Sequence, residues 1–412
     1  MSDSTVISRS APGNVHGPVT ALYTTGFAAD PDSHHRVMRK THGSLAPVEL
    51  SPGVPATLVL GYRQALQILH DEEHFPADPR TWQRDIPAEC PLRPMMEYRP
   101  NAIHTNGNER LRFRLPIADA LSSVDLHRLH TVVENLAVPL IKQFCTAGEC
   151  DVVGQYAFPI VFGALNDILG CPPEIGQRAA AGAAAILDSA ENAAEGSQIL
   201  EAALSDLIEV KRAAPGDDVT SWIMAHEVAL DDSEILHQLV LLYAAGISPA
   251  AYWISTSLLM MLTDDRFGGG LVSGALPTRD ALDEVLFTNP PMANYCLTYP
   301  RQPILIDDVW LPAHQPVVIS IAACNNDPTV RGGGDLTGNR SHLAFGIGPH
   351  ACPAQPVSYL IVQDAIDQLL DALPDMELGV PKKELRWRPG PFHRALTALP
   401  VTFTPTSMPI CQ

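Results

Sequence analysis

The stretch SHLAFGIGPHACPAQPVSYL, residues 341–360, places a cysteine between a loop rich in glycine and proline and the expected start of a helix. Gly346 and Gly348 permit backbone angles that other residues avoid. Pro353 directly follows Cys352 and is favourable as the first residue of a helix. We therefore expect Cys352 to lie at a helix N-terminus, where the helix dipole and free N–H groups would lower the pKa of its thiol.

A cysteine in this setting could serve several purposes. Most single cysteines are inert residues of the core. A nucleophilic cysteine would need a base, and the neighbouring His350 has no carboxylate close in sequence to orient it. Residues 346–351 also match a dinucleotide-binding glycine loop loosely, but that motif normally opens a βαβ unit. Ligation of haem iron by one thiolate needs no second protein ligand and fits the loop best.

The composition argues against several classes of protein. The net charge of −19 and the lack of a basic stripe argue against nucleic-acid binding. No stretch reaches the roughly 18–20 uninterrupted apolar residues of a membrane span, and the N-terminal sequence does not resemble a signal peptide. The eight cysteines show no CxxC pair or zinc-ligand spacing. We expect a soluble, cytoplasmic protein.

The hydrophobic pattern predicts a mainly α protein with small β-sheets, an α+β fold. Residues 48–62 have the alternation of two strands around a Pro-Gly turn, and a helix is expected at 62–71. Helical periodicity dominates from Glu109 onwards, and residues 233–262 should form a long apolar helix at the centre of the fold. Further helices are expected at about 278–288 and 353–372, and further strands within 304–320 and 395–403.

The chain is predicted to have one domain. We expect residues 1–30 to form a flexible N-terminal arm and residues 31–412 a single domain, because no repeat or linker divides them. The proline-rich stretch 75–106 shows no clear period, and a loop of that length typically covers an active site.

Part of the loop around the cysteine carries a family resemblance, through Phe345, Gly346, Gly348, His350 and Cys352. With Ala354 where glycine is commoner, the pattern resembles the haem-binding signature of cytochrome P-450, a family of haem-thiolate monooxygenases. The resemblance extends over nearly the whole chain. It implies the cytochrome P-450 fold, a triangular helical bundle with haem b (iron protoporphyrin IX) between the long central helix and the helix that follows the cysteine.

The resemblance also assigns residues around the haem. Cys352 would be the axial iron ligand, whose charge favours cleavage of the O–O bond, and Phe345 would limit water near its sulfur. Family members commonly carry His and Arg four residues apart on one helix; here both positions are arginines, which share a helix face. The groups suited to the haem propionates are Arg110, Arg114, Arg301 and His350.

One family motif is altered near residues 278–288. Family members almost always carry Glu-x-x-Arg there, which forms a buried ion pair, but in this chain Glu284 is followed by Phe287 in place of the arginine. Removing one partner of a buried pair costs roughly 3–5 kcal/mol. We therefore expect Arg331 or Arg340 to pair with Glu284.

A second motif is altered in the central helix. Family members usually carry Ala-Gly-x-Asp/Glu-Thr, where the acid and the alcohol relay protons to dioxygen; here the string runs from Ala245 to Pro249 as Ala-Gly-Ile-Ser-Pro. Ser248 cannot supply a proton at neutral pH as a carboxyl group can. Proline kinks a helix, so the break in the helix should remain. We expect a degenerate oxygen-activation site at Gly246, Ser248 and Pro249.

The resemblance implies a monooxygenase that inserts one oxygen atom from O2 into a small apolar metabolite, with electrons from ferredoxin and ferredoxin reductase. An acidic ferredoxin could dock at Arg110, Arg112 and Arg114. The altered motifs leave two alternatives: a peroxide-driven or non-oxygenating haem-thiolate enzyme, or a catalytically eroded haem-binding partner protein. The expected substrate pocket consists of Met95, Met96, Ala244, Ala245, Ala293 and Asn294.

Overall fold

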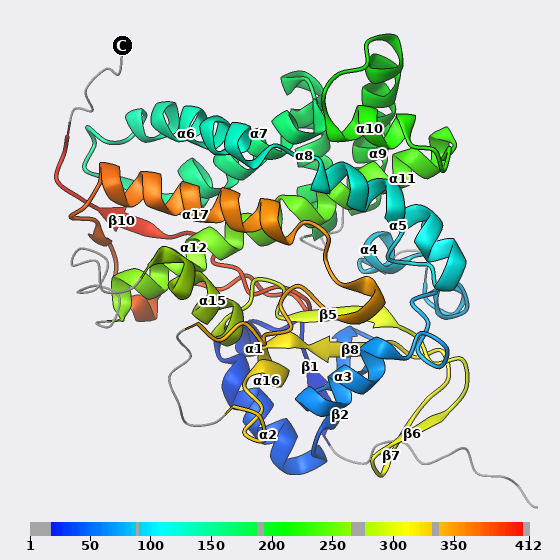
Figure 1. The fold of residues 1–412 in the computed structure, drawn as a ribbon. Coiled ribbons are helices and arrows are strands. Elements are labelled where there is room, and N and C mark those ends of the chain that lie inside the picture. Colours follow the sequence, from blue (N-terminus) through cyan, green and yellow to red (C-terminus); the bar gives the residue numbers. More distant parts are fainter. Residues whose placement is uncertain (1–17, 88–89, 188–192, 265–276, 332–337, 407–412) are drawn as a thin grey trace, which may run out of the picture.

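A computed structural model describes residues 18–87, 90–187, 193–264, 277–331 and 338–406 of the chain. Helices dominate it (Figure 1). The first helices along the chain are α1 (Thr25–Ala29), α2 (Pro31–His42), α3 (Tyr62–His70), α4 (Arg93–Met96), α5 (Gly107–Ser122), α6 (Leu126–Lys142), α7 (Phe158–Leu169) and α8 (Pro173–Leu187). They are followed by α9 (Ala193–Ala213), α10 (Val219–Ala225), α11 (Asp232–Gly246), α12 (Ser248–Thr263), α15 (Thr278–Thr288), α16 (Ile321–Asn325) and α17 (Gln355–Ala372). Short helical turns are η1 (Trp82–Arg84), η2 (Val153–Ala157), η3 (Gly348–His350) and η4 (Lys382–Glu384).

The strands of the described residues form small sheets. They are β1 (Thr20–Ala21), β2 (Leu45–Ser51), β3 (Val54–Val59), β4 (Glu149–Asp151), β5 (Asn294–Thr298), β6 (Ile304–Ile306), β7 (Val309–Leu311), β8 (Val317–Ser320), β9 (Glu377–Leu378) and β10 (Pro400–Thr402). A mixed sheet has the order β1-β2-β3-β8-β5, a second sheet the order β4-β10-β9, and β6 pairs with β7. The predicted α+β class is confirmed.

The N-terminal part of the chain adds an edge strand to the larger sheet. The predicted hairpin is present as β2 and β3, and Gly53 in its turn has a φ angle of 76°. Thr20 in β1 pairs with Val48 in β2, and Leu22 is completely buried. The flexible arm predicted for residues 1–30 is therefore wrong from Thr20 onwards, where the chain belongs to the folded body, and residues 1–17 lie outside the described residues.

The central helix is broken in the middle. It begins at a capping box in which Asp231 and Glu234 bind each other's backbone N–H groups. The sequence predicts one helix over 233–262, whereas the structure ends α11 before Ile247 and begins α12 after it. The predicted proline kink is the physical reason, since Pro249 has no N–H to continue the hydrogen-bond ladder.

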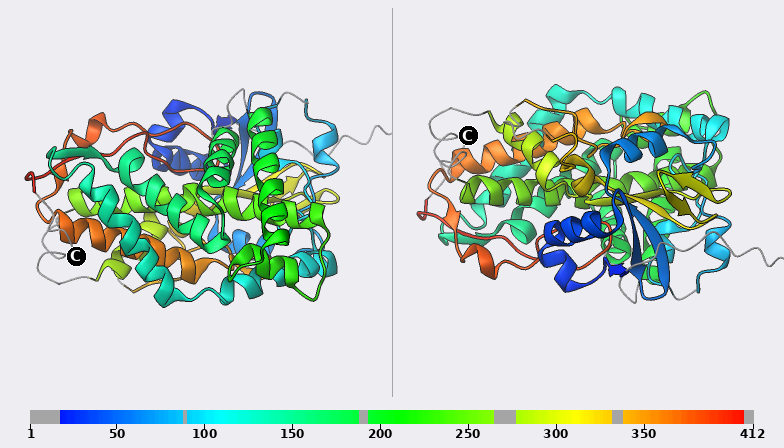
Figure 2. Two further views of the ribbon diagram at one scale, coloured as in Figure 1. Left: turned by 90° about the horizontal axis from the view of Figure 1, so that it is seen from above. Right: turned by 90° about the horizontal axis from the view of Figure 1, so that it is seen from below.

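The position of α12 explains its apolar sequence. It packs against α7, α15 and α17, and most of its side chains are buried. The segment Asp232–Thr263 is long and apolar enough to cross a membrane, but 67% of its most apolar window is buried inside the protein, as expected of a core helix. Figures 1 and 2 show α6 and α7 on one side of the molecule and the larger sheet with α1 to α3 on the other.

Candidate haem-thiolate site

Backbone contacts fix the loop around Cys352. The amide of Cys352 donates a hydrogen bond to the carbonyl of Phe345 over 2.8 Å. Gly346 and Gly348 have φ angles of 65° and 68°, as their place in the loop predicts. A Cβ atom on Gly348 would lie 2.8 Å from the carbonyl oxygen of Leu69 in α3, so only glycine fits there.

The side chain of Cys352 is exposed, yet the surrounding protein is so dense that burial raises the pKa of its thiol. We infer from these two facts that the side chain faces a hollow inside the protein. The backbone amide of Ala354 and the charge of Arg114 lower that pKa by smaller amounts. The predicted lowering is wrong, because α17 begins only at Gln355 and Cys352 stands ahead of the helix. A metal ion at this thiol would deprotonate it nonetheless.

Aromatic rings support the loop from behind. The ring centroid of Phe345 lies 5.8 Å from that of Trp253 on α12 and 5.5 Å from that of Tyr359 on α17. The Trp253 and Tyr359 rings meet edge to face at 4.7 Å. The cysteine loop is thus packed on the two helices that the resemblance predicts on either side of the haem, and the apolar wall limits water there.

The two arginines of α5 bind the same loop. Arg110 Nη1 donates to the carbonyl of Pro349 over 2.8 Å, and Arg114 Nη2 donates to the carbonyl of Ala351. These carbonyls flank His350. Arg110, Arg114 and His350 thus lie together in the structure, and their predicted role toward the haem propionates stays a prediction.

The polar groups of this cluster fit haem propionates. Arg110 Nε and His350 Nε2 lie 2.9 and 3.3 Å from Glu72 Oε1. Arg110 Nε, both ring nitrogens of His350 and Glu72 Oε1 are nevertheless buried without an aligned hydrogen bond in the described structure. Burial, helped by Arg110 and Arg114, lowers the pKa of His350 to about 4, so its neutral ring offers one N–H. A propionate would supply the acceptor that Arg110 and His350 lack.

Two more residues can be compared with the predictions for the propionate site: Arg301 was predicted, and Glu72 was not. Arg301 lies on an exposed bend after β5, and its role toward a propionate stays a prediction. Glu72 was not expected, because the string HDEEHF after α3 has no feature that distinguishes a buried acid from a solvated one.

The central helix brings small residues to the break. Ala245 is exposed although α11 belongs to the core, so it faces an internal hollow. A Cβ atom on Gly246 would lie 3.1 Å from Leu165, which indicates close approach of α11 to α7. Ser248 is 4% exposed. Since Pro249 has no N–H, the carbonyl of Ala245 loses its usual donor.

Asp283, the residue before Glu284, is a buried acid that pairs with an exposed arginine. Asp283 is completely buried, its Oδ2 lies 2.9 Å from Arg340 Nε, and the Tyr359 hydroxyl donates to its Oδ1. Arg331 donates instead to an asparagine side chain. Arg340 therefore pairs with Asp283, an acid that was not predicted, and the cation that pairs with Glu284 stays a prediction.

Phe287 makes an aromatic contact at the position where the family has a cation. Its ring is 4% exposed and lies edge-on to His342, with centroids 5.7 Å apart. Burial lowers the pKa of His342, which favours a neutral ring that can pack this way. His342 in turn lies 6.3 Å from Phe345. Phe287 therefore joins the aromatic support of the cysteine loop.

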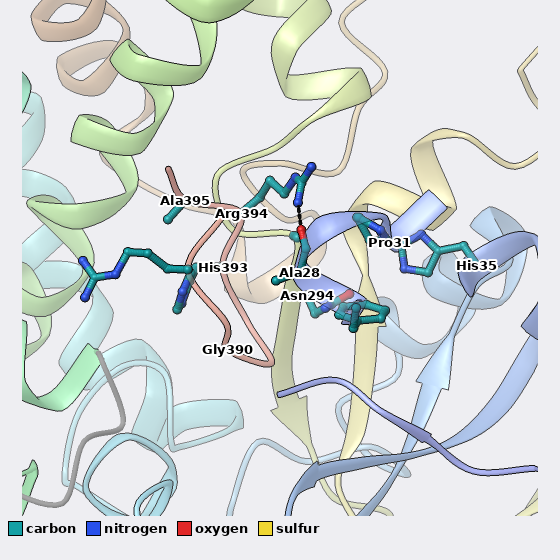
Figure 3. A pocket seen from close by; sticks show the side chains of 11 residues that line it. Ala28, Pro31, His35, Asn294, Gly390, His393, Arg394 and Ala395 are labelled. Carbon is teal, nitrogen blue, oxygen red and sulfur yellow. Dashed lines mark hydrogen bonds between the residues drawn. The ribbon is translucent and has the colours of Figure 1, made fainter. Parts of the chain in front are cut away.

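Two predicted pocket residues lie in a cavity too small for a substrate (Figure 3). Ala293 and Asn294 line a cavity of about 10 Å³, which can hold no more than one water molecule. The Asn294 side chain donates to the carbonyl of Pro391 over 2.8 Å, and Arg394 reaches across to the carbonyl of Ala28 (Figure 3). Asn294 and Arg394 thus join segments that are distant in the sequence, and contact of Ala293 and Asn294 with substrate stays a prediction.

The remaining predicted pocket residues come from two helices. Met96 on α4 is buried and Met95 is partly buried, while Ala244 and Ala245 lie on α11. Met95 packs against two separate hydrophobic clusters, one of which includes α11. Their contact with substrate stays a prediction.

Comparisons with known proteins agree with this geometry. No family model matches the chain. It is 25% identical over 398 residues to cytochrome P-450 107B1 of Saccharopolyspora erythraea, covering 93% of this chain and 98% of that protein. It is 27% identical over 390 residues to 2-hydroxy-5-methyl-1-naphthoate 7-hydroxylase of Streptomyces carzinostaticus, covering 90% and 95%. The structure of testosterone-bound CYP154C4 from Streptomyces superposes with a TM-score of 0.86 at 26% identity, covering 94% and 99%.

A helical fold with an exposed cysteine in a loop that two arginines bind beside a histidine fits a haem-thiolate protein. The chain belongs to the bacterial cytochrome P-450 monooxygenases, whose cofactor is haem b.

Proposed function

We propose that this cytochrome P-450 hydroxylates a small apolar metabolite at the hollow between Cys352 and Ala245. The observation that carries the proposal is the Cys352 thiol, which faces an internal hollow and is flanked by the Arg110 and Arg114 contacts. When bound, haem b supplies the redox chemistry that splits dioxygen and transfers one oxygen atom to the substrate. One similar protein is a hydroxylase of 2-hydroxy-5-methyl-1-naphthoate, which supports a small substrate with a large apolar ring system.

The residues of the chain have separate tasks in this proposal. Cys352 presents its sulfur, which accepts the N–H of Ala354, and Phe345 excludes water beside it. Arg110 and His350 orient the propionates through their unused N–H groups. The hydroxyl of Ser248 can position one water molecule at the helix break but cannot release a proton at neutral pH.

The electron donor is proposed to be ferredoxin with its reductase, in the cytoplasm. The arginines contribute less free charge to docking than expected, because Arg112 forms a double hydrogen bond with Glu234 and the other two bind the cysteine loop. Leu111 and Leu115 are 44% and 46% exposed on the same helix, so an apolar contact would contribute to docking.

A spectrum of the reduced, carbon monoxide-bound protein tests the ligand. We expect the red-shifted Soret band of thiolate ligation in the parent and its loss in Cys352→Ala. Persistence of that band in the variant would refute the assignment.

Peroxide-driven turnover is the second candidate, and the missing proton relay at Ser248 and Pro249 favours it. Product formation with NADPH, ferredoxin and reductase supports the first candidate; formation with hydrogen peroxide alone supports the second. In a ferredoxin-dependent enzyme, Ser248→Asp with Pro249→Thr should raise the fraction of electrons that reach product.

A further inference from the structure

A second hollow, of about 410 Å³, lies beside the break in the central helix. It is partly open and is lined by Gly154, by residues of α7 and α8, and by the residues at the break, Ile247 and Ser248. None of the residues predicted for the substrate pocket lines it. Pockets for drug-sized molecules occupy about 300–1,000 Å³, so its size suits a small organic ligand.

Small side chains on α8 leave the hollow open. Ala180, Ala181 and Ala184 face it, opposite the rings of Phe158 and Phe162 on α7. Helix α8 is fixed by its other face, where a Cβ atom on Gly182 would lie only 2.5 Å from the carbonyl oxygen of Gly196 in α9. This contact with α9 holds α8 in place. The alanine face of α8 therefore does not have to pack against α12, and the hollow between the helices stays open.

Ser248 provides the polar side chain in the lining of the hollow. It is 4% exposed, and its hydroxyl has no hydrogen bond to any residue that the structure describes. The other side chains of the lining are apolar. A molecule that fills the hollow excludes water from this hydroxyl, so a molecule that supplies a donor or an acceptor there would bind more tightly than one that does not.

We propose that this hollow binds an apolar molecule with a single hydroxyl or carbonyl group, and that Ser248 binds this group. The ligand occupies the α7–α8 side of the helix break, separate from the substrate near Cys352. The ligand contacts Ser248, the residue before Pro249, so its binding affects the part of the central helix where oxygen would be activated.

The experiment uses the haem-loaded protein with imidazole saturating the iron, so that the iron side is blocked. The probe is 2-naphthol, which is fluorescent and has one hydroxyl group; naphthalene, which has none, is its control. We expect 2-naphthol to bind once per chain and about fivefold more tightly than naphthalene, the effect of one neutral hydrogen bond. Ser248→Ala should abolish this preference.

Two variants fill the hollow, and one controls for them. Ala181→Phe and Ala184→Phe should each weaken binding at least about tenfold, while Ala202→Phe on the exposed face of α9 should leave it unchanged. The carbon monoxide spectrum identifies which variants keep the fold. Unchanged binding in the folded filling variants, or release of imidazole by 2-naphthol, would overturn the proposal.

Discussion

Tyr359→Phe tests whether the Asp283 pair stabilises the support of the cysteine loop. The change removes one hydroxyl group, and the ring keeps its packing on Trp253 and Phe345. Asp283 then loses the donor to Oδ1, while Arg340 stays on Oδ2. A completely buried carboxylate oxygen thus lacks its main hydrogen bond.

The size of the effect follows from the burial. A hydrogen bond to a charged group contributes about 1.5–3 kcal/mol, and this one is buried, so we expect a loss in that range. Unfolding entropies of about 2.1 cal/mol/K per residue convert that loss into a fall in Tm of about 2–4 °C for 412 residues. Scanning calorimetry of the haem-loaded protein measures it, and the carbon monoxide spectrum reports the thiolate-bound fraction.

A matched control is Tyr23→Phe, which removes a similar bond between a tyrosine and Glu49 at the surface. It should leave the Tm unchanged, because exposed pairs contribute little. The reasoning fails if Tyr359→Phe unfolds at the parent temperature, or if the variant loses as much stability in an Asp283→Asn background as in the parent.

Three further predictions concern pH, the loop and the propionate cluster. Burial lowers the pKa of His35 to about 3, against an ordinary value of 6.5, so the unfolded chain takes up the proton first as the pH falls. His35 should therefore reduce stability by about 1.4 kcal/mol per pH unit from 6.5 down to 3, and an acid titration of His35→Gln should be flatter by that slope. Gly348→Ala meets Leu69 and needs a positive φ angle, so it should lose the thiolate band, whereas Gly26→Ala, with nothing within 4 Å, should keep it. Arg110→Leu should speed transfer of haem to apomyoglobin more than Arg301→Leu does, since only Arg110 is buried; equal rates would contradict the assignment.

Features that depend on local backbone geometry can be predicted well from the sequence. The positive φ angles of the loop glycines and the break before Pro249 follow from residue type, and the spacing of Arg110 and Arg114 places them on one helix face, whereas their place beside the haem came only from the family resemblance. The start of α17 is predicted two residues too early, because Pro356 can occupy the first helical turn as well as Pro353 can.

Pairings between distant segments are predicted less well. Asp283 and Glu284 are adjacent acids on one helix, and only the packing of α15 on α17 decides which of them meets Arg340. Only the tertiary structure brings Glu72 close to Arg110 and His350, which are distant from it in the sequence. Periodicity identifies the buried face of a helix but not the partner across it.

The contacts of α5 with the cysteine loop set the order in which the site can be built. Arg110 and Arg114 bind carbonyl groups that lie 239 and 237 residues later in the chain. At synthesis rates of about 5–20 residues per second, α5 leaves the ribosome about 12–48 s before these carbonyls exist. During that interval the buried Arg110 and the partly buried Arg114 have no loop to bind. Haem can therefore be held only when synthesis is nearly complete, and a chain shortened before residue 349 would keep most helices but have no site.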